Sequence, residues 1–136
     1  MEKEKRSKPL VAIINNNEDL IRMLSEGLKA ADCNVVSVRL VDVRAAKVDL
    51  ELFVMDHDPD AVIFDLALPY RANLSMLEDL RGSGALAGRG LVLTTPNTRA
   101  ARDLARVDAF EITGLAEEIQ AVVREVLRVA RPLVEA

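Results

Sequence analysis

Short apolar runs alternate with segments of helical periodicity along the chain. The apolar runs are rich in Val, Ile and Leu and lie at Leu10–Ile14, Val35–Val41, Ala61–Leu66, Leu91–Leu93 and Val107–Ile112. Runs of this length and composition are typical of strands that are buried on both faces. Strand and helix alternate five times, which requires crossover connections of the right-handed kind. We therefore expect an α/β fold in which a doubly wound, five-stranded parallel sheet carries helices on both faces.

The five helical segments are marked by apolar residues at spacings of three and four. They carry, in chain order, Ile21, Leu24 and Leu28; Val43, Ala46, Leu50 and Phe53; Leu74, Leu77 and Leu80; Ala101, Leu104 and Ala105; and Leu115, Ile119, Val122, Val126 and Val129. One helix follows each strand, so the expected pattern is (βα)5. We assign residues 9–131 to this single domain, residues 1–8 to a polar N-terminal tail and residues 132–136 to a C-terminal tail.

Composition and charge narrow the classes of partner. Half of the 136 residues are hydrophobic and only 3% are aromatic, which predicts an aliphatic core. Eighteen basic and 22 acidic residues give a net charge of −4, the wrong sign for a domain that neutralises nucleic-acid phosphates. The basic residues of the tail, Lys3, Lys5, Arg6 and Lys8, are interrupted by Glu2 and Glu4 and are typical of a solvated segment. We expect no direct nucleic-acid binding.

The lone cysteine and the N-terminus indicate a location. Cys33 has no second cysteine with which to form an internal disulfide, and a single thiol suits a reducing compartment. The segment Met1–Lys8 is charged and does not resemble a signal peptide. No run approaches the roughly 18 apolar residues of a membrane span. We expect a soluble, cytoplasmic protein without a membrane partner.

Polar residues gather where the predicted strands end. Sites in open α/β sheets form at the carboxyl ends of the strands. The strands deliver there Asn15 and Asn16, Asp65, Thr94 and Thr95, and Glu111 and Thr113. Asp65 is the one carboxylate that follows a central strand directly.

Two of these segments resemble the receiver domains of two-component response regulators, the CheY-like family. Val11–Leu20 is similar to the family's first strand and Pro59–Pro69 to its third. In the second segment an aspartate ends an apolar strand and a proline follows four residues later, which resembles the phosphoacceptor signature and places that position on Asp65. The resemblance covers about Lys8 to Arg131. It implies the flavodoxin-like strand order 2-1-3-4-5.

The resemblance also implies roles for residues at other strand ends. The family's switch hydroxyl corresponds to Thr94, with Thr95 as an alternative one residue away, and its switch aromatic corresponds to Phe110. The acidic pair that holds magnesium in the family is replaced here by Asn15 and Asn16.

A second departure concerns the lysine that the family carries on strand five. Thr113 stands at that position, and no lysine occurs after Lys47. Phosphoryl transfer depends on positioning and on neutralising charge. Two unit charges 4 Å apart interact by about 4 kcal/mol at an effective dielectric constant near 20, so losing two carboxylates weakens a magnesium site severely. We therefore expect a degenerate pseudo-receiver that is not an enzyme and binds no cofactor.

The neutral pocket suggests a structural hypothesis. The side-chain amides of Asn15 and Asn16 could donate hydrogen bonds to Asp65 and so replace the missing cations in part. The pocket would then be fixed in one state.

Three functions remain open at this stage. The first is a scaffold that contacts a protein partner, which could be a histidine kinase, another regulator or an output domain, or that dimerises through helix 4, strand 5 and helix 5. That surface has a basic rim of Thr98, Arg99, Arg102, Arg106 and Arg124. The second is a phosphorylatable receiver that accepts a phosphoryl group on Asp65, with magnesium held by Glu18 or Glu111. The third is a nucleotide or flavin binder, which the absence of glycine and Ser/Thr from the first loop disfavours.

Each candidate residue also has a plainer interpretation. Asp65 could cap a helix or turn. Thr94 and Thr113 are β-branched and suit strands without any function, and Phe110 could be a core residue. His57 is expected to interact with the end of a helix rather than to bind a ligand. Tyr70, in the loop after strand three, could contact a partner or pack within the loop.

Overall fold

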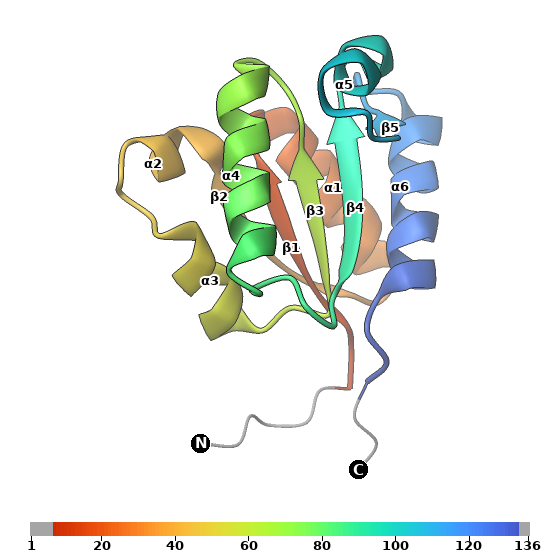
Figure 1. Ribbon diagram of the computed structural model, residues 1–136. Helices are drawn as coiled ribbons and strands as arrows, with labels where there is room; N and C mark the ends of the chain where they lie inside the picture. The colour runs from red at the N-terminus through yellow and green to blue at the C-terminus, as the bar shows by residue number, and fades with distance from the viewer. Residues whose placement is uncertain (1–6, 134–136) are drawn as a thin grey trace.

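The computed structural model describes residues 7–133 and contains one mixed α/β unit (Figure 1). The predicted tails lie partly outside these residues, at positions 1–6 and 134–136. In chain order the elements are β1 (Leu10–Asn15), α1 (Glu18–Ala30), β2 (Asn34–Arg39), α2 (Leu40–Arg44), α3 (Leu50–His57), β3 (Ala61–Asp65), α4 (Tyr70–Gly82), β4 (Gly90–Thr95), α5 (Thr98–Ala105), β5 (Phe110–Glu111) and α6 (Ala116–Val129).

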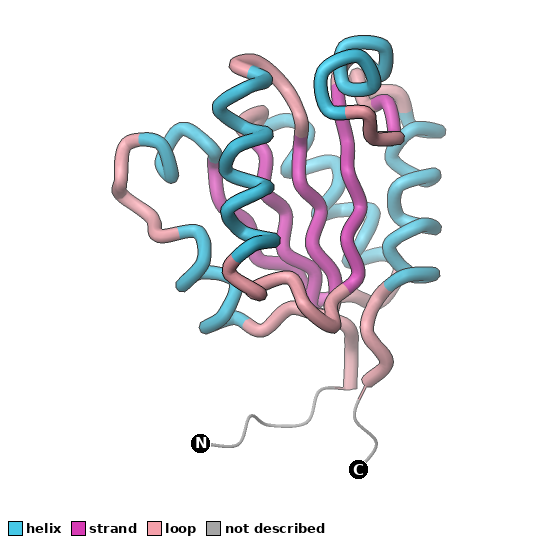
Figure 2. Tube along the Cα trace, viewed as in Figure 1, coloured by secondary structure: helices cyan, strands magenta, loops and turns pink. Residues whose placement is uncertain are grey.

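The five strands form one parallel sheet in the order β2-β1-β3-β4-β5. This confirms the predicted fold class and strand order. Figure 2 shows the strands running side by side, and because every pair is parallel their carboxyl ends lie at the same edge. Polar residues that end β1, β3 and β4 are therefore brought to one edge of the sheet.

Helices cover both faces of the sheet and divide the core into two layers. Along β1, Val11 and Ile13 pack in the layer beneath α1 and α6, whereas Ala12 and Ile14 pack in the layer beneath α2, α3 and α4. The alternation follows from the two-residue period of a strand. Both layers are aliphatic apart from Phe64 among their fully buried large side chains, as the composition predicts.

The prediction of one continuous second helix is wrong, because the structure has two shorter helices, α2 and α3, in that segment. α2 ends at Arg44, and Ala46 has a left-handed backbone conformation with φ of 58°. The chain then restarts as α3, where the side chain of Asp49 accepts a hydrogen bond from the N–H of Leu52 at 3.0 Å. This N-cap starts a new helix where apolar periodicity alone predicts a continuous one. The chain therefore has six helices among its described residues, not five.

The fifth strand is shorter than predicted. The apolar run Val107–Ile112 contributes only Phe110 and Glu111 to the sheet, where they pair with Thr94 and Thr95 of β4. Val107 and Ala109 pack against the core from the loop before the strand. Their burial accounts for the apolar run without strand pairing.

The described helices carry no membrane-spanning segment, because none is both long enough and apolar enough.

Candidate functional site

Three polar side chains lie on the same face of neighbouring strands at the carboxyl edge. Asp65 is in register with Thr94 of β4. Asn15 follows the paired residues Ile14 and Phe64 by one step. Residues in register on adjacent strands point to the same face. Asn15, Asp65 and Thr94 are all buried and lie on the face covered by α1 and α6.

Asp65 is held by a single short hydrogen bond among the described residues. The hydroxyl of Thr94 donates to its Oδ1 at 2.7 Å, and only 3% of Asp65 is exposed. Burial raises the pKa of Asp65 to about 6, and the hydrogen bond from Thr94 opposes this increase. The carboxyl group therefore changes its charge near neutral pH rather than near pH 4.

The two asparagines of the site are oriented by backbone groups. Oδ1 of Asn15 accepts hydrogen bonds from the N–H groups of Asn16 at 2.6 Å and Asn17 at 2.9 Å. Its Nδ2 is buried and has no hydrogen-bond partner. Oδ1 of Asn16 accepts from the N–H of Val41 at 3.2 Å.

The hypothesis that Asn15 donates a hydrogen bond to Asp65 is therefore wrong. The physical reason is the local turn after β1. Two backbone N–H groups hold the amide oxygen of Asn15, and this fixes the direction in which its amide nitrogen points. For Asn16, the structure shows the contact with Val41 at the start of α2.

The two threonines considered for the switch hydroxyl, Thr94 and Thr95, point to opposite faces of β4. Thr95 points to the opposite face from Thr94, and its hydroxyl donates to the carbonyl of Leu66 at 2.6 Å. Thr94 is thus the hydroxyl that contacts Asp65. Phe110, which pairs with Thr94 across β4 and β5, is half-buried against the core layer of α1 and α6.

Thr113 is not brought together with Asp65. It is exposed, and its hydroxyl lies 3.0 Å from Oε1 of Glu118. The same oxygen accepts the N–H groups of Thr113, Gly114 and Leu115 at 2.8, 3.1 and 3.0 Å. Glu118 thus caps the start of α6 and is the hydrogen-bond partner of Thr113. An acidic residue in the first turn of a helix is well placed to accept such bonds.

The two glutamates considered as alternative metal ligands have other partners. Glu18, at the start of α1, forms an ion pair with Arg39 at 3.2 Å. Glu111 is exposed and accepts a hydrogen bond from Thr98 at 3.5 Å. Within residues 7–133, no group of three or more His, Cys, Asp or Glu side chains could hold a metal ion.

A solvent-accessible cavity of about 410 Å³ lies over Asp65. It is lined by Asn15, Asn16, Asn17, Leu20, Asp65, Ala67, Leu68, Tyr70 and Pro96. Sequence reasoning missed the apolar wall of Leu20, Leu68 and Pro96, since these residues come from three loops or helix ends with no common spacing. Tyr70 does lie in this wall, where it begins α4.

The remaining candidate residues lie away from the cavity. His57 ends α3, and its Nδ1 lies 2.8 Å from the carbonyl of Phe53, which agrees with the expected helix-terminal role. In the basic rim, Arg102 pairs with Asp108 at 3.7 Å, and Arg99, Arg106 and Arg124 are exposed.

Comparisons with known proteins identify the fold. No protein-family model matches the sequence, and no curated protein matches it. Solved structures do match. The bacteriophytochrome response regulator AtBRR is 21% identical with a TM-score of 0.60, covering 96% of this chain and 100% of that one. A receiver domain (CheY-like) from Methylobacillus flagellatus is 17% identical with a TM-score of 0.59, covering 88% and 99%.

A response regulator from Thermotoga maritima is also similar, with 12% identity and a TM-score of 0.59 over 88% of this chain and 98% of that one. These likenesses are low in sequence identity and nearly complete in length. The chain has the fold of the CheY-like response regulator receiver domains.

Proposed function

We propose that this chain is a receiver module of two-component signalling that acts through protein contact, without magnesium-dependent phosphorylation of Asp65. The observation that carries the proposal is the neutral environment of Asp65. This buried carboxyl group contacts a threonine hydroxyl, and its pKa is raised to about 6. Asn15 and Asn16 beside it are neutral, so the site offers a divalent cation one carboxylate where the resemblance implies three.

Three of the side chains considered as magnesium ligands already have other partners. An amide oxygen has two lone pairs, and both on Asn15 Oδ1 accept backbone N–H groups. Oδ1 of Asn16 accepts from Val41, and Glu18 pairs with Arg39. The residues present therefore do not fit a magnesium ion, which prefers several oxygen ligands in near-octahedral geometry.

We propose that the chain acts by contacting a protein partner through the surface of α5, β5 and α6. The surface of α5, β5 and α6 has exposed arginines together with exposed Leu115 and Leu127. Arginine is enriched at interfaces, and an apolar residue within a polar rim is a common interface pattern. A histidine kinase, another regulator, an output domain or a second copy of this chain are the partner classes that we propose for this surface.

The deciding experiment is incubation with acetyl phosphate and magnesium, followed by intact-mass measurement. We expect no phosphoryl adduct on the wild-type chain. A variant with Asn15→Asp, Asn16→Asp and Thr113→Lys restores the acidic pair and the lysine, and serves as the positive control for accessibility of Asp65. An adduct on the wild type that disappears in Asp65→Ala would establish the alternative, a phosphorylatable receiver.

A further inference from the structure

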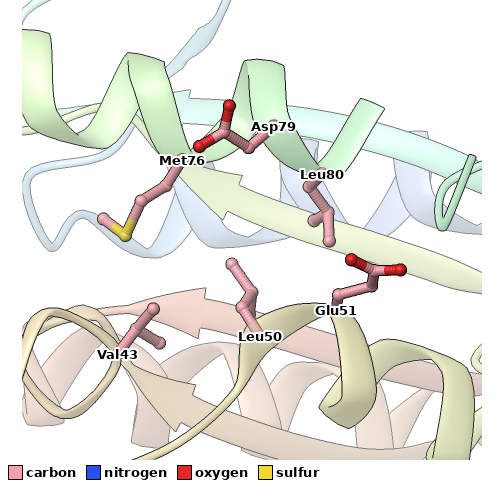
Figure 3. A pocket seen from close by; sticks show the side chains of 6 residues that line it. All are labelled: Val43, Leu50, Glu51, Met76, Asp79 and Leu80. Carbon is pink, nitrogen blue, oxygen red and sulfur yellow. The ribbon is translucent and has the colours of Figure 1, made fainter. Parts of the chain in front are cut away.

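The break between α2 and α3 leaves a groove against α4, on the face of the sheet opposite to Asn15 and Asp65. The groove has a volume of about 180 Å³ and is lined by Val43, Leu50, Glu51, Met76, Asp79 and Leu80. Figure 3 shows the side chains of Val43 and Leu50 on one side of the gap and those of Met76 and Leu80 on the other. Four apolar side chains from three helices thus form its walls.

The size of the groove limits what it can hold. Sites for whole small molecules usually have volumes of about 300–1,000 Å³, whereas a cavity of about 150 Å³ accommodates one benzene-sized group. A groove of about 180 Å³ therefore fits a single large apolar side chain. A protein segment that inserts such a side chain is a better match than a free ligand.

The charge of the groove selects the kind of segment. Glu51 and Asp79 lie on α3 and α4, on opposite sides of the apolar walls, and both are exposed. Neither carboxylate belongs to an ion pair among residues 7–133. A bound segment that carries Lys or Arg beside its apolar anchor would pair with both, while an acidic segment would be repelled.

We propose that this groove docks a basic segment of a partner protein, anchored by one large apolar side chain such as Leu, Met or Phe between the helices. The segment is held by burial of that side chain against Val43, Leu50, Met76 and Leu80, and is selected by Glu51 and Asp79. The proposal adds a second contact surface to the protein-contact function. It does not depend on the chemistry of Asp65, so the phosphodonor experiment and the test below can fail separately.

The test is selection of short random peptides, displayed on phage, against the full chain. We expect enrichment of peptides in which a large apolar residue is flanked by Lys or Arg. Binding of the enriched peptides should fall at least about tenfold in the double variant Glu51→Lys/Asp79→Lys. It should change by less than about twofold in Glu26→Lys/Glu117→Lys, which alters the net charge equally at exposed residues of α1 and α6.

Circular dichroism and urea unfolding would check that both double variants remain folded, and the milder Glu51→Gln/Asp79→Asn replaces the reversal should it unfold the chain. Enriched peptides without cationic residues, or binding that survives the charge reversal, would overturn the proposal. So would concentration-dependent self-association, measured by analytical ultracentrifugation, that the same reversal abolishes, because a second copy would then be the occupant.

Discussion

The pKa of the Asp65 carboxyl group reflects the burial and the neutral surroundings of this residue. Its pKa of about 6 arises because burial disfavours the charged form by more than the Thr94 hydroxyl stabilises it. Between pH 4 and pH 6 the folded chain therefore holds a proton on Asp65 that the unfolded chain has lost. By linkage, this group makes the free energy of unfolding fall as pH rises through that window.

Replacing Asp65 with asparagine tests this predicted dependence of the free energy of unfolding on pH. Asp65→Asn keeps the acceptor for Thr94 and removes the buried charge, so it should stabilise the chain relative to the wild type as pH rises. The difference in unfolding free energy should change by on the order of 2–3 kcal/mol between pH 4 and pH 7, since one pKa unit corresponds to about 1.4 kcal/mol. Urea unfolding across this pH range measures it. Asp103→Asn, at an exposed position, is the control, and a pH-independent difference for Asp65→Asn would contradict the interpretation.

At the scale of the residue, the sequence predicts buried strand positions better than loop positions. The contact of Thr94 with Asp65 follows from two apolar strands that end in register. Asn16 and Thr113 lie outside the strands, where their side chains are free to bond nearby groups, and they contact Val41 and Glu118. Sequence spacing alone cannot decide such local competition.

Among the helices and strands, β4 and α6 approach each other closely at Gly90. A Cβ atom added at Gly90 would overlap the carbonyl oxygen of Val129. Glycine is thus required at the first residue of β4 for α6 to end where it does.

Gly90→Ala should therefore lower the free energy of unfolding by about 1–3 kcal/mol, the usual cost of overpacking a rigid site. Gly82→Ala provides the matched control, because a Cβ atom there has no neighbour within 4 Å and Gly82 ends a helix. Alanine at that position should be neutral or slightly stabilising. Urea denaturation of both variants gives the comparison, and equal stabilities would show that α6 moves aside without cost.

The start of α6 depends on Glu118. Its carboxylate accepts the N–H groups of Thr113, Gly114 and Leu115, and these bonds, led by that of Thr113, hold the pKa of Glu118 below its usual value. Because the pKa is lowered on folding, this stabilisation is complete above the ordinary pKa and is lost as pH falls through the lowered one.

Glu118→Ala should reduce stability by about 1 kcal/mol at pH 7, as loss of a helix cap does. The reduction should shrink at acidic pH, where the wild-type group is protonated. Glu117→Ala, which removes the neighbouring exposed glutamate of the same helix turn, should have a smaller effect. Chemical denaturation at pH 3 and pH 7 measures the difference, and equal effects of the two substitutions would contradict the capping role.

Element positions were predictable where apolar periodicity is uninterrupted, as in β1, β3, α4 and α6. The break between α2 and α3 was not, because Val43 and Leu50 keep helical spacing across the turn at Ala46. The signal that could have located it is Asp49, a good N-cap residue directly before Leu50. An N-cap residue within a segment of helical periodicity can therefore mark the start of a new helix even where the apolar spacing continues across it.

At the scale of the whole molecule, a cluster of ions ties the end of the described chain to the amino edge of the sheet. The guanidinium of Arg131, beyond α6, donates to Oδ1 of Asp60 at 3.0 and 3.1 Å and to Oδ1 of Asp58 at 3.1 Å. Asp60 also accepts the N–H of Leu10 at 2.8 Å. β1, β3 and the segment after α6 therefore meet at one edge, opposite to the candidate site (Figure 1).

The pKa of Asp58 sets the pH range in which its ion pairs stabilise the fold. Burial disfavours the charged form of Asp58, yet hydrogen bonds from Arg131 and Arg89 lower the pKa of Asp58 to about 2. Its contribution to stability is therefore present above about pH 4 and is lost as pH falls toward 2. Asp58 therefore stays charged in the range near pH 6 where the charge of Asp65 changes, so these two carboxyl groups at opposite ends of the sheet respond to separate ranges of pH.

Arg131→Ala should consequently destabilise the chain by about 2–3 kcal/mol at pH 7, since it removes the guanidinium from the buried carboxylate of Asp60. Arg131→Lys keeps the charge but cannot donate to both aspartates with the same planar geometry, so we expect an intermediate loss. Arg128→Ala breaks an exposed pair with Glu125 and should destabilise the chain less than either substitution of Arg131. Urea unfolding at pH 7 orders the three variants. If Arg131→Ala were no more destabilising than Arg128→Ala, the side chain of Arg131 would add no more to the stability of the fold than an exposed ion pair does, and the hydrogen bond from its backbone N–H to the carbonyl of Asp60 at 2.8 Å would remain as the tie between the segment after α6 and the sheet.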